Sequence, residues 1–488
     1  MAIPAMYVYC RRAGTFTKPL FALSRQAGKG LPRMNRLSEI LFKLALMAGA
    51  FCAAALLLRD AMAISQHVPL DPNEGWNAYH ALAAMSGRPL YPHDMMVNNY
   101  PPLSFYIVGA LGRSLGDMIL AGRLVSLLSF VAVAMGLAAL VRQSDGTPLQ
   151  ALLASLIFAT ALLITSDYVA MDDPQLLGHA LQIEALLLIL RPQASIALAA
   201  LLMMAGLFVK QNLFVLPLAV LLWLIWKDRN AAWRFCLYAA GTGIAGLAAA
   251  WIGLGVFLPA EIASPRAWSI GNLVLAAMRY GGWALPPLLA TAWAGWRWRS
   301  DPLIGFCAIY ALLSLAAGIG FSAGDGVDAN IFFDLDIAMA LMAGLALSRL
   351  RPQARGIFAL VYAVPLALFL ARDFRDANFA YTEGFARQGP LDVAFLTIAP
   401  GPALCESLAL CYWADKPAEV DVFNLAEASK TGARNEQVLI DALNRRRYSA
   451  VQFASLDPFP LGEKARAALL ANYRVHHIDD NGVFLRPR

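Results

Sequence analysis

Residues 117–141 read DMILAGRLVSLLSFVAVAMGLAALV, and the only charged side chains in this stretch are Asp117 and Arg123. A helix needs about 20 consecutive, mainly apolar residues to cross the hydrocarbon core of a bilayer. The stretch therefore predicts a membrane-spanning helix, and runs of the same kind recur along most of the chain.

The other apolar runs are separated by charges or by Pro and Gly, and each predicts a further span. They cover residues 37–58, 149–166, 175–190, 194–209, 213–226, 232–258, 273–296, 302–320, 331–347 and 356–371. The sequence therefore predicts an α-helical polytopic membrane protein with about 11 spans.

The composition supports a membrane protein and excludes a nucleic-acid partner. Charged residues make up 15% of the 488 residues and hydrophobic residues 59%, whereas soluble proteins carry about 25% charged residues. The net charge of +6 comes from basic residues scattered through short loops. No basic patch interleaved with aromatic residues is present, so nucleic acid is not predicted to bind.

One apolar run, 101–116, is too short for a confident span. It opens with Pro101-Pro102 and contains Arg113, features that favour an interfacial or re-entrant helix. If this run does not cross, residues 59–116 form a long first loop on the outer face of the membrane.

Charge then sets the predicted orientation. Residues 1–36 carry basic residues and no acid, and positive segments stay in the cytoplasm. This tail lacks the apolar core and cleavage site of a signal peptide. We therefore expect a multi-pass protein of the inner (plasma) membrane with a basic cytoplasmic tail at 1–36, spans within 37–374, and residues 375–488 on the outer, periplasmic side.

The segment 375–488 changes character, because charges become frequent and apolar runs shrink. It predicts a soluble α/β domain ending in a hairpin turned by Asn481-Gly482. Its predicted elements are strands at 402–405, 420–423 and 449–454 and helices at 406–414, 435–446 and 462–471. An outer location favours a Cys405–Cys411 disulfide, whereas a regular helix over 406–414 would hold the two cysteines too far apart. The sequence leaves this choice open.

Acidic residues gather in three outer loops, and three basic residues lie at similar depth. The acids are Asp71 with Glu74, Asp172 with Asp173, and Asp325 with Asp328; the bases are Arg123, Lys210 and Arg279. Charges at a membrane boundary cost free energy unless they are solvated, paired or functional. Solvated loop charges and a snorkelling lysine are the alternatives to a binding site.

No cofactor is predicted, and a divalent-metal site of His and Asp side chains stays open as the alternative. The outer histidines His67, His80, His93 and His179 show no HxxxH or HxH spacing. No GxGxxG fingerprint is present either, so no nucleotide cofactor is expected.

Four segments together resemble the membrane-embedded C-type (GT-C) glycosyltransferases. They are LDPNEGWNAYHALAAMSGRPLYP at 70–92, NYPPLSFYIVGAL at 99–111, AGRLVSLL at 121–128 and MDDPQLLGHAL at 171–181. The likeness is to the branch that holds the protein O-mannosyltransferases (family 39-like) and the aminoarabinose transferase of lipid A. It implies a GT-C-like fold and an inverting transfer of sugar from a polyprenyl-phosphate-linked donor to a hydroxyl of a glycan, lipid or protein.

The resemblance also implies roles for the acids. In the family an acid of the first outer loop is the general base, but here Asn73-Glu74 replaces the usual acidic pair. We expect Glu74 to be the base, with Asp71 as the alternative or as the cap of a helix that begins near Asn73. Asp172 and Asp173 are expected to orient the acceptor or the base.

The family has a basic residue before a proline at the position of Tyr100. The phosphate contact is therefore expected from Lys210, Arg279 or Arg123. The other residues expected to bind substrate are Asn73, Tyr100, Gln211, Asn212, Asp325 and Asp328. A transporter or flippase of lipid-linked sugars, or a non-catalytic protein that binds glycan or prenyl lipid, remains the alternative function.

Overall fold

The computed structural model describes residues 31–92, 95–165, 168–191, 193, 195–263, 266–375 and 378–488. Most of the predicted tail 1–36, and His93, lie outside these residues.

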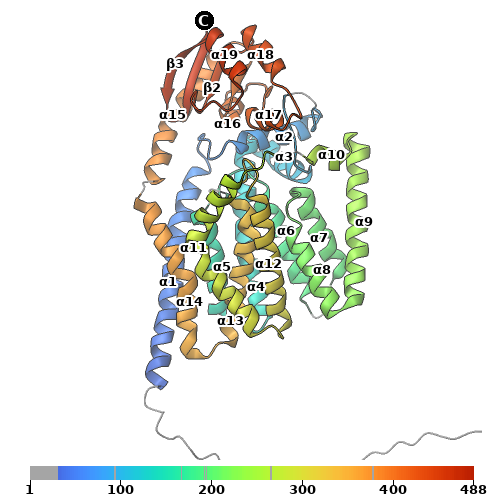
Figure 1. Cartoon of the computed structure of the whole chain (residues 1–488), viewed down its shortest axis with the longest axis vertical. Helices are drawn as coiled ribbons and strands as arrows, with labels where there is room; N and C mark the ends of the chain where they lie inside the picture. The colour runs from blue at the N-terminus through green and yellow to red at the C-terminus, as the bar shows by residue number, and fades with distance from the viewer. Residues whose placement is uncertain are drawn as a thin grey trace, which may run out of the picture.

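Every predicted span is a helix in the described chain, and these helices lie side by side in one bundle (Figure 1). They are α1 (Leu31–Ala63), α4 (Met118–Gln143), α5 (Pro148–Thr165), α6 (Gln175–Ile189), α7 (Ile196–Val209), α8 (Val215–Lys227), α9 (Arg229–Leu254), α11 (Ile270–Arg297), α12 (Pro302–Phe321), α13 (Phe333–Arg349) and α14 (Pro352–Arg375). Within the described residues six helices are long and apolar enough to cross a membrane, and α5 to α8 are shorter apolar helices. The predicted polytopic α-helical fold is confirmed.

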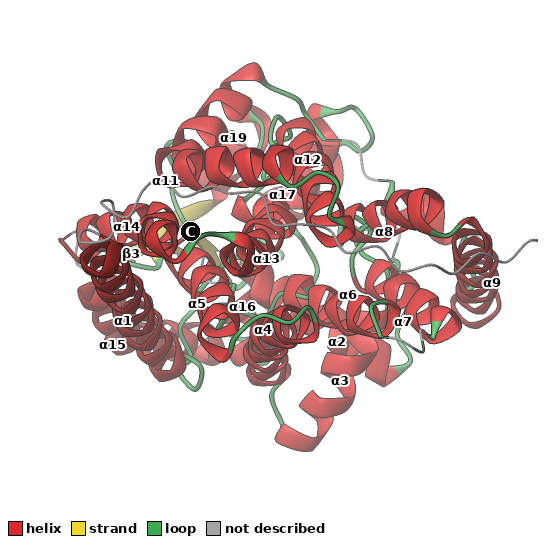
Figure 2. Cartoon of the chain, turned by 90° about the horizontal axis from the view of Figure 1, so that it is seen from below, coloured by secondary structure: helices red, strands yellow, loops and turns green. Residues whose placement is uncertain are grey.

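Helix α13 lies at the centre of the bundle (Figure 2). Every side chain from Phe333 to Leu347 is buried. A helix that is buried on all sides needs neighbours on all sides, and α4, α5, α11, α12 and α14 all pack against α13. Small residues such as Ala343 and Gly344 let these neighbours approach closely, since the α-carbon of Gly344 faces side chains of α4 and α5.

Three short helices lie at the end of the bundle that also carries the C-terminal unit, which we call the domain end (Figure 1). They are α2 (Asn73–Ser86), α3 (Leu103–Leu115) and α10 (Leu258–Ile262). Helix α1 ends here and α4 begins here. The two ends lie together, since the Arg123 side chain of α4 donates a hydrogen bond to the carbonyl of Ala63, the last residue of α1. Helix α3, which is 13 residues long, packs here against α2 and α4.

The C-terminal unit is a small sheet with helices, connected to α14 by α15 (Asn378–Ile398). The strands are β1 (Ala403–Cys405), β2 (Ala450–Phe453), β3 (Tyr473–Asp479) and β4 (Gly482–Pro487), in the order β1-β2-β4-β3. Only β1 and β2 pair in parallel; β2–β4 and β3–β4 are antiparallel. The helices are α16 (Leu408–Trp413), α17 (Val422–Lys430), α18 (Gln437–Asn444) and α19 (Glu463–Asn472).

Two predictions for this unit need correction or completion. The predicted strand at 420–423 is wrong: Asp421 accepts a hydrogen bond from the Asn424 amide and caps α17, which begins at Val422. Helix α16 begins only at Leu408, so Cys405 lies on β1 outside the helix. The Cα atoms of Cys405 and Cys411 are 6.0 Å apart, and the two residues form a disulfide.

The C-terminal unit packs directly on the short helices of the bundle. Gly75 of α2 faces the backbone of Ala409 in α16 so closely that a β-carbon there would overlap it. The Tyr79 hydroxyl donates to the carbonyl of Lys416 (2.6 Å), and the Met118 amide donates to the Tyr412 hydroxyl (2.8 Å). These contacts hold the sheet and its helices over the domain end of the bundle.

Candidate active site

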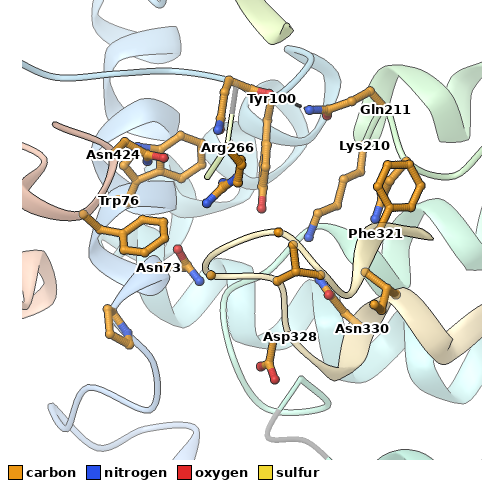
Figure 3. Close-up of a pocket in the computed structure, with 18 of the residues that line it drawn as sticks. Asn73, Trp76, Tyr100, Lys210, Gln211, Arg266, Phe321, Asp328, Asn330 and Asn424 are labelled. Carbon is orange, nitrogen blue, oxygen red and sulfur yellow. Dashed lines mark hydrogen bonds between the residues drawn. The ribbon is translucent and has the colours of Figure 1, made fainter. Parts of the chain in front are cut away.

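A cavity of about 770 Å³ lies between the domain end of the bundle and the C-terminal unit (Figure 3). Its size is within the range of ligand sites, about 300 to 1,000 Å³. Its polar and aromatic lining comes from loops and from the end turns of helices: Asp71, Asn73, Trp76, Asn99, Tyr100, Tyr168, Lys210, Gln211, Asn212, Arg266, Trp268, Phe321, Asp328, Asn330, Glu406, Asp421, Phe423 and Asn424. Residues far apart in the sequence therefore converge on one space.

Asp71 supplies a carboxylate to this cavity. Its Oδ1 atom accepts a hydrogen bond from the Asn73 amide (2.7 Å) just before α2. The N-cap of α2 is Pro72 and has no side-chain cap bond, so Asp71 is not the cap that the sequence offered as an alternative. Among the described residues, its Oδ2 atom has no hydrogen-bond partner. Burial raises the pKa of Asp71 to about 6, and the carboxylates of Asp173, Glu74 and Asp328 add to this rise.

Glu74 does not line the cavity. Its side chain is 0% exposed, and both of its oxygens are occupied. Arg123 donates to both oxygens (2.7 Å each), the Leu70 amide to Oε2 (2.8 Å) and the Asp172 amide to Oε1 (3.1 Å). A buried carboxylate whose two oxygens are occupied by these four donors has no access to a substrate. The geometry does not support the prediction that Glu74 is the base.

Arg123 is equally enclosed and is not positioned as a phosphate ligand. Its side chain is 1% exposed. Beyond its two bonds to Glu74, it donates to four backbone carbonyls at the end of α1, those of Ala63, Ile64, Gln66 and Val68. The Glu74–Arg123 pair therefore fixes the chain between α1 and α2 against α4, and so positions Asp71 at the cavity wall.

The second predicted acidic pair, Asp172 and Asp173, lies behind the wall of the cavity. The Asp173 carboxylate contacts Lys210 Nζ at 3.1 Å through both oxygens and also accepts from the Gln175 amide (2.7 Å). Asp172 is buried beside Glu74, and its carbonyl accepts from the Asn77 side chain (2.7 Å). Neither Asp172 nor Asp173 lines the cavity. Asp173 contributes to the cavity indirectly, because it holds the ammonium group of Lys210 in place.

Two basic side chains of the described residues line the cavity, Lys210 and Arg266. Lys210 lies at the end of α7, with its ammonium 4.8 Å from the ring centre of Tyr100. Arg266 points into the cavity (Figure 3) and donates to the carbonyl of Asp325 (3.3 Å). Among the described residues no carboxylate forms an ion pair with Arg266. An anionic ligand would supply the missing partner.

Arg279 and Asp325 lie outside the cavity. Arg279 is exposed on α11. Asp325 is bonded to Lys430 (3.0 Å) and Asn272 (2.6 Å), and these hydrogen bonds lower its pKa. Arg279 therefore does not contribute to the cavity, and Asp325 links its loop to α17 and α11. Asp328 does line the cavity and caps the short helix that begins at Ala329.

The other predicted substrate-binding residues do line the cavity: Asn73, Tyr100, Gln211 and Asn212. Gln211 donates to the carbonyl of Asn99 (2.7 Å, dashed in Figure 3), which positions the neighbouring Lys210 loop. The Trp76 indole donates to the carbonyl of Val97 (2.8 Å) and so holds the loop before Tyr100.

Of the outer histidines, His67, His80 and His179 do not line this cavity, and His93 lies outside the described residues. His80 is buried among Trp76 and Phe105, and burial lowers its pKa to about 3. His179 is buried in α6, and His67 stacks on Trp413.

Sequence reasoning missed Arg266 and the acids of the C-terminal unit, Glu406 and Asp421. A signal for Arg266 did exist, since it is a basic residue in a predicted outer loop that otherwise carries the acid Glu261. No sequence signal pointed to Glu406 or Asp421, because the contact of the C-terminal unit with the bundle is not encoded in a local motif. Burial raises the pKa of both carboxyls, that of Asp421 to about 6.

No protein-family model matches the chain, and no curated protein shows significant sequence similarity to it. Two crystal structures of ArnT from Cupriavidus metallidurans do share its architecture. The apo structure aligns with a TM-score of 0.59 at 13% identity, over 89% of this chain and 97% of that one. The structure bound to undecaprenyl phosphate aligns with a TM-score of 0.59 at 12% identity, over the same shares.

Identity this low establishes the fold and not the reaction. ArnT is an aminoarabinose transferase with a GT-C fold, which is the branch that the segments at 70–92 and 171–181 resemble. The GT-C-like fold predicted from these segments is confirmed.

Proposed function

We propose that this chain is an inverting glycosyltransferase that moves a sugar from a polyprenyl-phosphate-linked donor to an acceptor hydroxyl. One observation carries the proposal: the cavity brings Asp71 together with Lys210 and Arg266, of which Arg266 has no carboxylate partner among the described residues. A carboxylate facing unpaired positive charge suits a reaction with a nucleophilic hydroxyl and a phosphate leaving group. The fold supports the same reading, since ArnT has been solved with undecaprenyl phosphate.

The bonds that change determine what each side chain does. The acceptor oxygen attacks the anomeric carbon, the bond from that carbon to the phosphate oxygen breaks, and the configuration inverts. Asp71 accepts the proton that the hydroxyl loses. Arg266 and Lys210 stabilise the charge that develops on the departing lipid phosphate. Asp173 holds Lys210 in position, and the buried Glu74–Arg123 pair holds Asp71.

We also propose the orientation that the charge pattern predicts, with a cytoplasmic N-terminus and an extracytoplasmic C-terminal unit. The Cys405–Cys411 disulfide supports it, because disulfides persist in oxidising compartments. The cavity then opens at the outer face of the membrane, where polyprenyl-linked donors and glycan, lipid or protein acceptors are accessible.

Incubation of the purified chain in lipid nanodiscs with radiolabelled undecaprenyl-phosphate sugar tests the reaction. We expect label to leave the lipid only when an acceptor extract is present, and undecaprenyl phosphate to accumulate. A flippase of lipid-linked sugars would move the intact donor between leaflets, and a non-catalytic binding protein would retain it. Intact donor after incubation with acceptors from the source membrane would contradict the proposal.

Removal of either basic side chain of the cavity, Arg266 or Lys210, should weaken donor binding. A charge-assisted hydrogen bond contributes about 1.5 to 3 kcal/mol, so Arg266→Ala should raise the donor KM by about 10- to 100-fold. Lys210→Ala should raise it as well, and it also leaves the Asp173 carboxylate buried without its cation. Steady-state kinetics with varied donor concentration measures both effects. Arg279→Ala is the matched control, since Arg279 is exposed on α11, and an effect confined to Arg279→Ala would overturn this assignment of the phosphate site.

The acid limb of the pH profile should report Asp71. A base must be deprotonated to accept a proton, and the pKa of Asp71 is raised to about 6. Transfer, measured as kcat/KM, should therefore decline as the pH falls through about 6. Asp328→Asn removes one of the carboxylates that raise this pKa, so it should move the limb to lower pH. Asp480 lies in the β3–β4 turn, so Asp480→Asn should leave the acid limb of the pH profile unchanged.

A further inference from the structure

A second cluster of ionisable side chains lies in the C-terminal unit, away from the cavity. Asp392 of α15 meets His477 and Asp479 of β3. One ligand atom from each of the three residues lies within 4.8 Å of the other two. Two carboxylates and an imidazole at this spacing form the donor set of a transition-metal site.

The two separations from the imidazole nitrogen match tetrahedral coordination, and the two carboxylates lie within 4.8 Å of each other. His477 Nε2 lies 3.5 Å from Asp392 Oδ1 and 3.3 Å from Asp479 Oδ2. Bonds of about 2.0 to 2.1 Å from zinc to nitrogen and oxygen place tetrahedral ligand atoms about 3.3 Å apart. Both separations are longer than a good hydrogen bond between these atoms, about 2.7 to 2.9 Å for a charged pair.

One of the two carboxylate oxygens of Asp392 lacks a hydrogen-bond donor. Its side chain is 0% exposed, and its Oδ1 atom, which faces His477, has no hydrogen-bond partner among the described residues. Leaving a buried charged oxygen without a partner is costly. A cation between the three side chains would satisfy this atom.

The surrounding groups orient the three side chains as outer-sphere partners do around metals. The Asn481 side chain donates to Asp392 Oδ2 (2.6 Å), which leaves Oδ1 free to coordinate. Asp479 accepts from the Asn481 amide (2.9 Å) and from the Gln388 side chain (3.2 Å).

The imidazole of His477 is held in the same way. Its ring stacks on Phe484, with centroids 4.5 Å apart and planes at 6°. Its Nδ1 atom lies 2.9 Å from Nδ1 of His476. With the proton on Nδ1, this contact leaves the Nε2 lone pair directed at the two carboxylates, which is the tautomer that a metal ion requires.

We propose that Asp392, His477 and Asp479 bind one divalent first-row transition-metal ion, with zinc as the reference ion. An imidazole nitrogen beside carboxylates favours such ions over magnesium and calcium, which prefer oxygen ligands alone. The ion joins β3 to α15, the helix that connects the sheet to α14 in the bundle. It thus fastens the C-terminal unit to its connection with the membrane helices. The site is independent of the glycosyl-transfer proposal.

The test is stoichiometric zinc binding to the full chain in lipid nanodiscs. The chain is purified without a histidine tag, stripped with a chelator and dialysed against graded free zinc, and bound metal is counted by mass spectrometry. We expect one tightly bound zinc per chain. His477→Gln and Asp392→Asn should each weaken it by at least about 100-fold, because loss of an outer-sphere partner alone costs about 10- to 100-fold.

Asp480→Asn is the control, since Asp480 is the exposed neighbour of Asp479 and should bind zinc as the parent chain does. Cobalt(II) in the unaltered chain tests the site without a variant that could misfold, because a tetrahedral nitrogen–oxygen site gives intense visible absorption bands. Absence of stoichiometric zinc in the parent chain would overturn the proposal in favour of a protonated His477 between two carboxylates. Unchanged zinc affinity in folded His477→Gln, or octahedral cobalt bands, would overturn it too.

Discussion

Asp71→Asn should abolish sugar transfer while the protein stays folded and binds its donor. Loss of a general base costs about 10² to 10⁴ in rate, so we expect kcat to fall by that factor with little change in the donor KM. Asparagine keeps the oxygen that accepts the Asn73 amide, so the start of α2 is preserved. Turnover of labelled donor, together with the thermal midpoint of the same preparation, measures the effect.

Asp325→Asn provides a matched control in the same compartment. This carboxylate pairs with Lys430 and Asn272 outside the cavity, so its amide should transfer sugar at close to the normal rate. Near-normal kcat in Asp71→Asn would remove Asp71 from the reaction. The next acid to examine would then be Asp328, which lines the same cavity.

Glu74→Gln should also lose activity, but through the loss of stability. The change leaves the buried Arg123 guanidinium without a counter-charge, and breaking a buried ion pair in this way costs about 3 to 5 kcal/mol. The glutamine side chain would also place its NH₂ group, a hydrogen-bond donor, against groups that are themselves donors. These are the Arg123 guanidinium, the Leu70 amide and the Asp172 amide. We expect a large fall in the midpoint of thermal or denaturant unfolding in detergent.

Asp71→Asn is the comparison for this variant, because it lies in the same segment and removes the same single negative charge. Its unfolding midpoint should remain close to that of the parent chain, whereas that of Glu74→Gln falls. A stable, folded Glu74→Gln that binds donor and does not turn it over would return the role of base to Glu74.

The spans could be predicted from hydropathy because the bilayer imposes a length and a polarity on each helix. The elements that were missed or misplaced are set by contacts instead. Val420–Phe423 has the composition of a strand, yet the Asp421 side chain caps the amide of Asn424 and starts α17. The helical connection α15 carries Pro390 and mixed polarity, so no regular apolar pattern marks it.

The site could be predicted to the level of loops but not of individual carboxylates. Asp71 and Glu74 are three residues apart in one segment, and either fits a first-loop acid. The choice depends on Arg123, a charge in an apolar helix that requires an acidic partner. Its partner is decided by the packing of α4 on α2, which no local pattern in the sequence expresses. Arg266 was missed for a related reason, because its importance follows from its place in the cavity wall without an ion pair to any carboxylate of the described residues.

The most direct test of the central claim, that this cavity holds the lipid phosphate beside the catalytic base, is a cryo-electron microscopy structure with undecaprenyl phosphate in nanodiscs. The account predicts phosphate density between Arg266 and Lys210, within hydrogen-bond distance of both (about 2.7 to 3.2 Å), with the Asp71 carboxylate facing the same space. Phosphate bound on the exposed face of α11 beside Arg279, with the cavity unchanged, would contradict it.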